Sequence, residues 1–157
     1  MKVHVLERVQ RVPAPLDEVF GFFARPENLA EITPPNLGFQ ILTPSPIAMK
    51  EGAVIDYVVS LGGLPLRWRT LITCHEPPHK FVDEQLSGPY SFWHHTHTFR
   101  ALPDGGTELG DVVRYALPFG PLGDLAHALV VGRQVAGIFS HRRRVIADRF
   151  GRTEDTP

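Results

Sequence analysis

The chain has 157 residues, with 16 lysines and arginines against 17 aspartates and glutamates, so its formal net charge is −1. A chain of this length is expected to fold as one domain with a real core, and the near-neutral charge excludes a global field that would attract nucleic acid or anionic membrane. The lone cysteine, Cys74, excludes an internal disulfide and favours a reducing compartment. The sequence shows no secretory apolar block and no stretch long enough to cross a bilayer, so we expect a cytoplasmic protein without integral membrane association.

The first part of the chain predicts a strand followed by two short helices. Val3, Val5 and Val9 alternate with polar residues, as in a strand with one buried face. Apolar residues within 16–23 recur at helical spacing, and acidic residues in the first turn favour a helix there. A proline then opens a second brief helical turn over 26–30.

Six further strands are expected between the short helices and residue 117. Glycine and proline clusters separate them, and strands joined by such short turns pair antiparallel as a meander. The expected strands span about 38–42, 53–60, 66–75, 80–87, 91–101 and 106–117.

The stretch 121–150 predicts one long C-terminal helix, because it contains no proline after its first residue. Apolar residues recur at steps of three or four and are expected to form one buried stripe. The stripe consists of Leu122, Leu125, Leu129, Val135 or Ala136, Phe139, Ile146 and Phe150. The basic run 141–144 is expected to be a solvated face that complements the negative end of the helix dipole. Residues 151–157 are expected to be a frayed tail.

This order of elements predicts an α+β fold, with residues 1–150 as its single domain. A strongly curved, seven-stranded antiparallel sheet would wrap around the long C-terminal helix, and the two short helices between strands 1 and 2 would close one edge. A sheet that curved cannot touch the helix along its whole length. The space left between them is expected to be an apolar cavity.

Several motifs in the second half of the chain support a family resemblance. They are Gly88-Pro89-Tyr90, Trp93-x-His95-x-His97-x-Phe99, Asp111 and Tyr115-x-Leu117-Pro118. With the order of elements, they make the whole chain resemble the START-like (SRPBCC, helix-grip) superfamily, and within it a bacterial ligand-binding, polyketide cyclase-like branch. The resemblance implies a helix-grip fold. It does not imply one function, since members bind lipids, hormones, polyketides and flavonoids, and only some are enzymes.

The strand around residues 91–101 carries the chemistry that the cavity could use. Strand alternation places His95 and His97 on the same face as two aromatic residues, which is expected to be the inner face. The turn positions predict that Asp83 lies opposite His95 and that Asp111 lies opposite His97. These two carboxylate–imidazole pairs could satisfy each other's hydrogen bonds, orient a ligand, or act in general acid–base catalysis.

The same register predicts the other residues of the cavity wall. Alternation across the neighbouring strand puts Trp68, Thr70, Ile72 and Cys74 on the inner face. The residues expected to contact a ligand are Trp68, Gln85, Trp93, His95, His97, Tyr115, Val135 and Phe139.

Two histidines at i and i+2 with a carboxylate opposite could also form an open three-ligand metal site, as in cupin barrels. The glutamate that a cupin needs a few residues later is missing, and a cupin has no place for the long terminal helix. We therefore expect no metal and no other cofactor.

The function favoured by these features is binding of a hydrophobic small molecule, such as a lipid, an isoprenoid or an aromatic polyketide. The alternative is a cyclase, dehydratase or isomerase that uses His95 or His97 beside Asp83 and Asp111 as acid–base groups. A third reading is a regulatory protein whose loop at Thr33 responds to ligand. No nucleic-acid partner is expected, and homodimerisation is left open.

Overall fold

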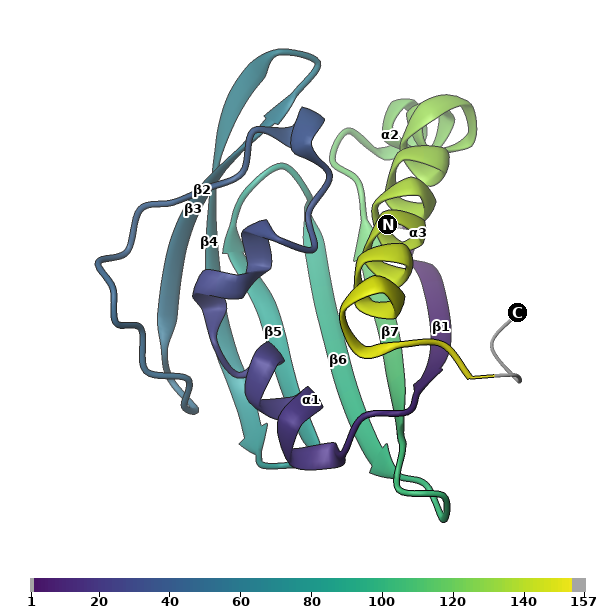
Figure 1. The fold of residues 1–157 in the computed structure, drawn as a ribbon. Helices are drawn as coiled ribbons and strands as arrows, with labels where there is room; N and C mark the ends of the chain where they lie inside the picture. Colours follow the sequence, from purple (N-terminus) through teal and green to yellow (C-terminus); the bar gives the residue numbers. More distant parts are fainter. Residues whose placement is uncertain (1, 154–157) are drawn as a thin grey trace.

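A computed structural model describes residues 2–153 of the chain (Figure 1). One antiparallel sheet of seven strands, in the order β1-β7-β6-β5-β4-β3-β2, curves around the C-terminal helix α3. The expected helix-grip fold is confirmed. Part of the predicted tail, residues 154–157, lies outside the described residues.

The elements follow one another along the chain in the predicted order. The first half consists of β1 (His4–Val12), α1 (Leu16–Phe23), the 3-10 turns η1 (Pro26–Ala30) and η2 (Pro35–Leu37), β2 (Gln40–Ile41) and β3 (Val54–Leu61). The second half consists of β4 (Leu64–Glu76), β5 (Lys80–Ser87), β6 (Phe92–Ala101), β7 (Thr107–Ala116), α2 (Gly120–Ala126), the π-helical turn η3 (His127–Val131) and α3 (Gly132–Phe150). Within residues 2–153, no helix is long and apolar enough to span a membrane.

The predicted single helix over 121–150 is divided by the π-helical turn η3. A π-turn holds more residues than an α-turn, so it rotates the helix face that follows relative to the face that precedes it. Only the second half of the predicted stripe is therefore buried, with Val135, Phe139 and Ile146 facing the sheet. The prediction was wrong for the first half, because Leu122 and Leu125 are exposed, as is Leu129.

The strand β1 buries the opposite face from the one predicted. Val5 and Val9 are exposed, while Leu6 and Gln10 are buried. Leu6 packs with Val135 of α3, and the Gln10 side-chain amide donates a hydrogen bond to a backbone carbonyl of the same helix, at 2.9 Å from O of Arg143. This bond satisfies the buried amide, so the polar residue can occupy the inner face.

Two hydrophobic clusters hold the helix against the sheet and leave space between them. In the first, Phe20 of α1 packs edge-on against Phe99 of β6, with ring centroids 5.1 Å apart, and Ile146 of α3 belongs to the same cluster. The second joins Val113 of β7 to Phe139 of α3. The concave face of the sheet therefore carries a filled core at both places.

Candidate functional site

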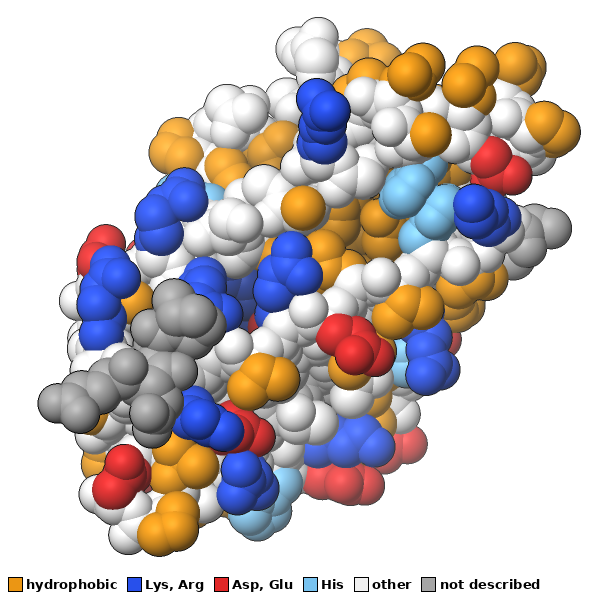
Figure 2. Space-filling view, turned by 90° about the vertical axis from the view of Figure 1, so that its right-hand side faces the viewer, with side chains coloured by type: hydrophobic (Ala, Val, Ile, Leu, Met, Phe, Trp, Pro, Cys, Tyr) orange, Lys and Arg blue, Asp and Glu red, His pale blue; other side chains and the backbone are white. Residues whose placement is uncertain are grey.

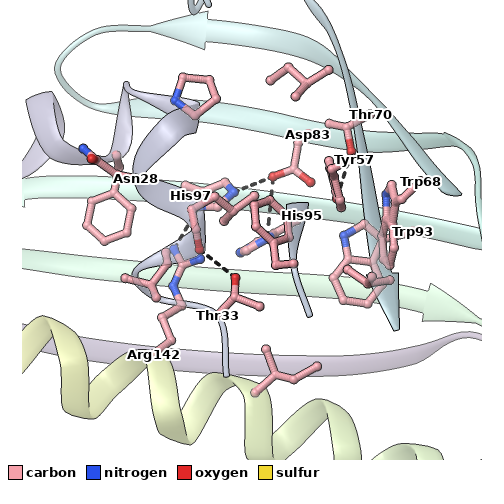
Figure 3. Close-up of a pocket in the computed structure, with 18 of the residues that line it drawn as sticks. Asn28, Thr33, Tyr57, Trp68, Thr70, Asp83, Trp93, His95, His97 and Arg142 are labelled. Carbon is pink, nitrogen blue, oxygen red and sulfur yellow. Dashed lines mark hydrogen bonds and ion pairs between the residues drawn. The ribbon is translucent and has the colours of Figure 1, made fainter. Parts of the chain in front are cut away.

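An internal cavity of about 180 Å³ lies between the concave face of the sheet and the helix α3 (Figure 3). Strands β3 to β6 form its main wall, and the segment from α1 to η2 closes another side. Its lining is mostly apolar and aromatic, including Phe22, Phe23, Leu29, Ile32, Ile55, Tyr57, Trp68, Ile72, Tyr90, Trp93, Ile138 and Phe139. Charged and imidazole groups gather at one place on this wall.

The strand register around that place is the predicted one. Asp83 on β5 lies opposite His95 on β6, and His97 lies opposite Asp111 on β7. Trp93 pairs with Tyr115 as expected. The side chains, however, bond across the diagonals rather than along these pairs. His95 Nε2 and Asp111 Oδ1 are hydrogen bonded at 2.7 Å, and His97 Nε2 and Asp83 Oδ2 at 2.6 Å.

The two imidazoles and two carboxylates form one cluster rather than two separate pairs. The rings of His95 and His97 stack with centroids 3.6 Å apart and planes inclined by 29°. Each carboxylate also approaches the other ring, since Asp83 Oδ2 is 3.7 Å from His95 Nδ1 and Asp111 Oδ1 is 3.5 Å from His97 Nδ1. Diagonal neighbours on adjacent strands lie within reach of long side chains, which is why this crossed arrangement is sterically available.

Arg142 of α3 completes the cluster, and the prediction of a fully solvated basic run was wrong for it. Its side chain is buried, and its Nη2 atom lies 3.3 Å from both Asp111 Oδ1 and His97 Nδ1. The guanidinium also lies over the rings of Phe23 and Phe139, at 5.0 and 5.7 Å from their centroids. Its position three residues after Phe139 on the buried helix face is the signal that could have found it.

Burial and the neighbouring charges together determine the protonation of His97. Burial, together with the positive charge of its neighbours, lowers the pKa of His97 to about 4, although Asp83 opposes this shift. Neutral His97 fits its contacts: Nε2–H donates to Asp83, and Nδ1 accepts from the Arg142 guanidinium. Burial acts to raise the pKa of Asp83 and Asp111, but the imidazoles and Arg142 outweigh it and hold both below their usual range.

His95 is the cavity-lining imidazole that has a ring nitrogen left for a ligand. Its Nε2 is bonded to Asp111, whereas its Nδ1 lies 3.7 Å from the nearest cluster carboxylate, which is too far for a hydrogen bond. His95 lines the cavity, while Asp111 lies behind it and does not. The pair therefore presents one ring nitrogen to the cavity with a carboxylate fixing the ring from the other side.

The possible metal-ligand atoms of Asp83, His95 and His97 lie within 4.8 Å of one another, close enough for all three to approach one metal ion. Three of the four ring nitrogens are already hydrogen bonded to Asp83, Asp111 or Arg142. A guanidinium 3.3 Å from His97 Nδ1 would repel a cation. The donor set therefore fits a hydrogen-bonding cluster better than a cation site.

The other predicted ligand contacts divide into two groups. Trp68, Trp93 and Phe139 line the cavity together with His95 and His97. Trp68 packs edge-on against Trp93, with ring centroids 5.2 Å apart, so the two indoles form one aromatic wall.

Gln85, Tyr115 and Val135 do not line the cavity, contrary to the prediction. The Gln85 side chain clamps the following turn, because its Oε1 accepts from Tyr90 N at 3.1 Å and its Nε2 donates to Tyr90 O at 2.7 Å. The Tyr115 hydroxyl is bonded to His127 Nε2 at 2.7 Å, and Val135 is wholly buried in the second hydrophobic cluster. Strand alternation does not reveal the partners of Gln85 and Tyr115, and helix periodicity does not show whether Val135 meets the core or the cavity.

Cys74 also departs from its predicted position. A β-bulge between Ile72 and Cys74 shifts the register, so Cys74 pairs with Val82 instead of continuing the inner face. Trp68, Thr70 and Ile72 precede the bulge and do lie on the cavity wall.

Sequence reasoning did not place Tyr57 or Asn28 on the cavity wall. Tyr57 on β3 lies opposite Trp68, and its hydroxyl is within 3.2 Å of Thr70 Oγ1. Burial raises the pKa of the Tyr57 phenol, and the negative charge of Asp83 adds to this. Asn28 and Thr33 come from the segment that closes the cavity, so the loop named in the regulatory reading is part of the wall (Figure 3).

Comparison with known proteins supplies a family and a set of structural neighbours. The family model described as polyketide cyclase/dehydrase and lipid transport matches residues 12–142. Among curated proteins, none matches the chain by sequence.

Similar solved structures include a START superfamily protein from Mycobacterium smegmatis, with a TM-score of 0.70 and 12% identity over 94% of this chain and 97% of that one. The Zhui aromatase/cyclase from Streptomyces sp. R1128 gives a TM-score of 0.66 and 18% identity over 94% and 96%. The major latex-like protein 151 from Panax ginseng gives 0.68 and 12% over 94% and 97%. At these identities the likeness shows the fold alone.

Proposed function

Because the chain belongs to the polyketide cyclase/dehydrase and lipid transport family of the START-like superfamily, we propose that it binds a hydrophobic small molecule in the cavity between sheet and helix. The observation that carries the proposal is an apolar cavity with polar groups gathered at one place on its wall. Affinity would come from burial of apolar surface, at about 25 cal/mol per Å². The imidazole of His95 would orient the one polar group of the ligand.

The cavity's size and chemistry narrow the ligand class. An engineered apolar cavity of about 150 Å³ holds benzene, and this one measures about 180 Å³. The aromatic wall of Trp68 and Trp93 favours a flat ring system, and His95 favours a hydroxyl or carbonyl group on it. A lipid, an isoprenoid or an aromatic polyketide carries such a combination in part of its structure.

Partly filling the cavity should weaken ligand binding. In Ile138→Trp the larger side chain enters the cavity, and the loss of about 55 Å² of ligand contact would lower affinity for N-phenyl-1-naphthylamine about tenfold. Fluorescence titration with the dye measures the change. The matched control is Ser140→Trp, because Ser140 is an exposed residue of the same helix and should leave affinity unchanged. Equal dye affinity for both variants, or no saturable binding by the wild-type protein, would contradict the proposal.

One observation favours catalysis as the second candidate function. His95 presents Nδ1 to the cavity while Asp111 holds Nε2, which is the arrangement of a general base with an orienting carboxylate. Such a base could remove the proton α to a carbonyl, the first step that a cyclase, dehydratase or isomerase requires. His95 Nδ1 would take the proton, and the electron pair of the broken C–H bond would pass to the enolate oxygen.

A small aromatic ketone tests this role. The protein is expected to accelerate exchange of the α-protons of 2-tetralone in D₂O, and His95→Gln should slow the protein-dependent rate by about 10²–10⁴-fold. Mass spectrometry follows the exchange, and dye titration checks that the variant still binds. Equal rates for the two proteins would leave His95 as a binding residue only.

A further inference from the structure

The segment from Phe119 to Val130 exposes a dense group of large apolar side chains. Phe119 is 81% exposed and adopts a left-handed conformation with φ of 71°, which is costly for a residue other than glycine. Leu122, Leu125, Leu129 and Val130 are each more than half exposed. Large exposed apolar groups of this kind mark interaction surfaces. Leu64 of the β3–β4 hairpin is also 61% exposed. We call the following residues the apolar rim: Leu64, Phe119, Leu122, Leu125, Leu129 and Val130.

The apolar rim continues the two walls of the cavity. On the β3–β4 hairpin, Leu61 lines the cavity and pairs with Leu64, so the two side chains lie on the same face of the hairpin. On the helix, Val130 precedes the cavity-lining residue Gln134 by about one turn. The β3–β4 turn and α2 lie at the same end of the molecule (Figure 1). Hydrophobic side chains gather at that end in the space-filling view (Figure 2).

The charges near the apolar rim suit an anionic surface. The rim segments 61–69 and 117–134 contain Arg67, Arg69 and Arg133 and one acidic residue, Asp124. Arg69 is paired with Asp56 of β3 at 2.8 Å, so Arg67 and Arg133 are the arginines that could meet an anionic surface. Apolar side chains flanked by arginines are typical of elements that lie at a membrane interface without crossing it. The rim is also divided between a hairpin and a helix on either side of the cavity end. A lipid bilayer is one continuous apolar phase, so it can contact the hairpin and the helix at the same time. A flat patch on a second copy of the chain would not need a rim that is divided in this way.

We propose that the apolar rim docks on the surface of a lipid bilayer, with the cavity end toward the membrane. The docking proposal itself depends only on the apolar rim. Its functional consequence rests on the proposed function, because a docked protein could pass a hydrophobic ligand between bilayer and cavity without exposing the ligand to water. The strained exposed Phe119 and the π-turn that keeps the first half of the helix off the sheet both serve this arrangement.

Vesicle binding tests the proposal. Co-sedimentation with vesicles of phosphatidylcholine and phosphatidylglycerol should show binding by the wild-type protein and at least a tenfold weaker partition for the double variant Leu122→Gln/Leu129→Gln. Glutamine keeps the helix propensity, and both positions are exposed, so folding should be unaffected. The matched control is Val5→Thr/Val9→Thr, which replaces two apolar residues of β1 that are also more than half exposed. It should bind vesicles as the wild type does.

Three outcomes would overturn the docking proposal: no binding by the wild-type protein, equal loss in both double variants, or a wild-type dimer that Leu122→Gln/Leu129→Gln dissociates in sedimentation velocity. The last would show that a second copy covers the rim. Dye titration separates this proposal from the proposed function. If the wild-type protein binds the dye but does not bind vesicles, only the docking proposal is contradicted. If it binds vesicles but never takes up a hydrophobic dye, only the ligand-binding function fails.

Discussion

Replacing Arg142 by alanine is expected to lower the free energy of unfolding by about 3–5 kcal/mol, because it removes the cation from a buried cluster that contains two carboxylates. Asp83 and Asp111 would then carry their charges in the interior without the guanidinium. The packing of the guanidinium over Phe23 and Phe139 would be lost as well. For a chain of this size the expected fall in melting temperature is about 10 °C.

Arg144→Ala provides the matched control for this experiment. It removes the same charge from the same helix two residues further on, but Arg144 is exposed. Its effect on the free energy of unfolding should stay within about 0.5 kcal/mol. Urea denaturation of the two variants gives the comparison directly. Equal stabilities would show that the buried position of Arg142 has no energetic importance, contrary to the structure.

Acid is expected to destabilise the protein partly through His97, whose pKa is about 4 in the folded state against 6.5 for the free side chain. Between these values the unfolded state binds more protons than the folded state, so stability falls as the pH falls from 6.5 toward 4. The contribution is fully present above pH 6.5 and amounts to roughly 3 kcal/mol lost by pH 4. Asp83 and Asp111, whose pKa values are lowered by the cluster, add further losses as the pH falls below 3.8.

His97→Gln isolates this contribution. Glutamine can still donate to Asp83 and accept from Arg142, but it does not titrate. Chemical denaturation at pH 7, 5.5 and 4 should show that the wild-type protein loses roughly 3 kcal/mol more than the variant over this range. Parallel pH profiles would mean that His97 titrates at its ordinary pKa and that the cluster does not hold it neutral.

The structural neighbours support the fold and leave the ligand to experiment. The chain resembles both an aromatase/cyclase and a major latex-like protein at similar TM-scores of 0.66 and 0.68. Similar backbones therefore belong to proteins with different names, as expected when function depends on the groups placed in a shared cavity. In this chain the polar groups on the cavity wall include His95, His97, Asp83 and Arg142, and the exchange experiment tests His95 among them.

The amino-acid sequence by itself determined the order of the elements and the pairing of the central strands. Because side chains alternate strictly along a strand, the turns at Gly88-Pro89 and at residues 103–106 sufficed to place Asp83 opposite His95 and His97 opposite Asp111. The tertiary structure decided the rest. The hydrogen bonds join His95 to Asp111 and His97 to Asp83, which are diagonal neighbours rather than directly opposed residues. The pairing of Cα atoms does not show which neighbour a long side chain reaches.

Helix periodicity places Arg142 on the same face as Phe139, but only the fold could bring it next to carboxylates that lie far away in the sequence on β5 and β7. The helix periodicity likewise predicted an apolar stripe, but it could not show where a π-turn would rotate that stripe away from the sheet. The π-turn at His127–Val131 moved Leu122 out to the surface while Phe139 stayed on the core. Local spacing thus fixed which residues share a strand or a helix face, and long-range packing decided which of those faces met the cavity, the core or the exterior.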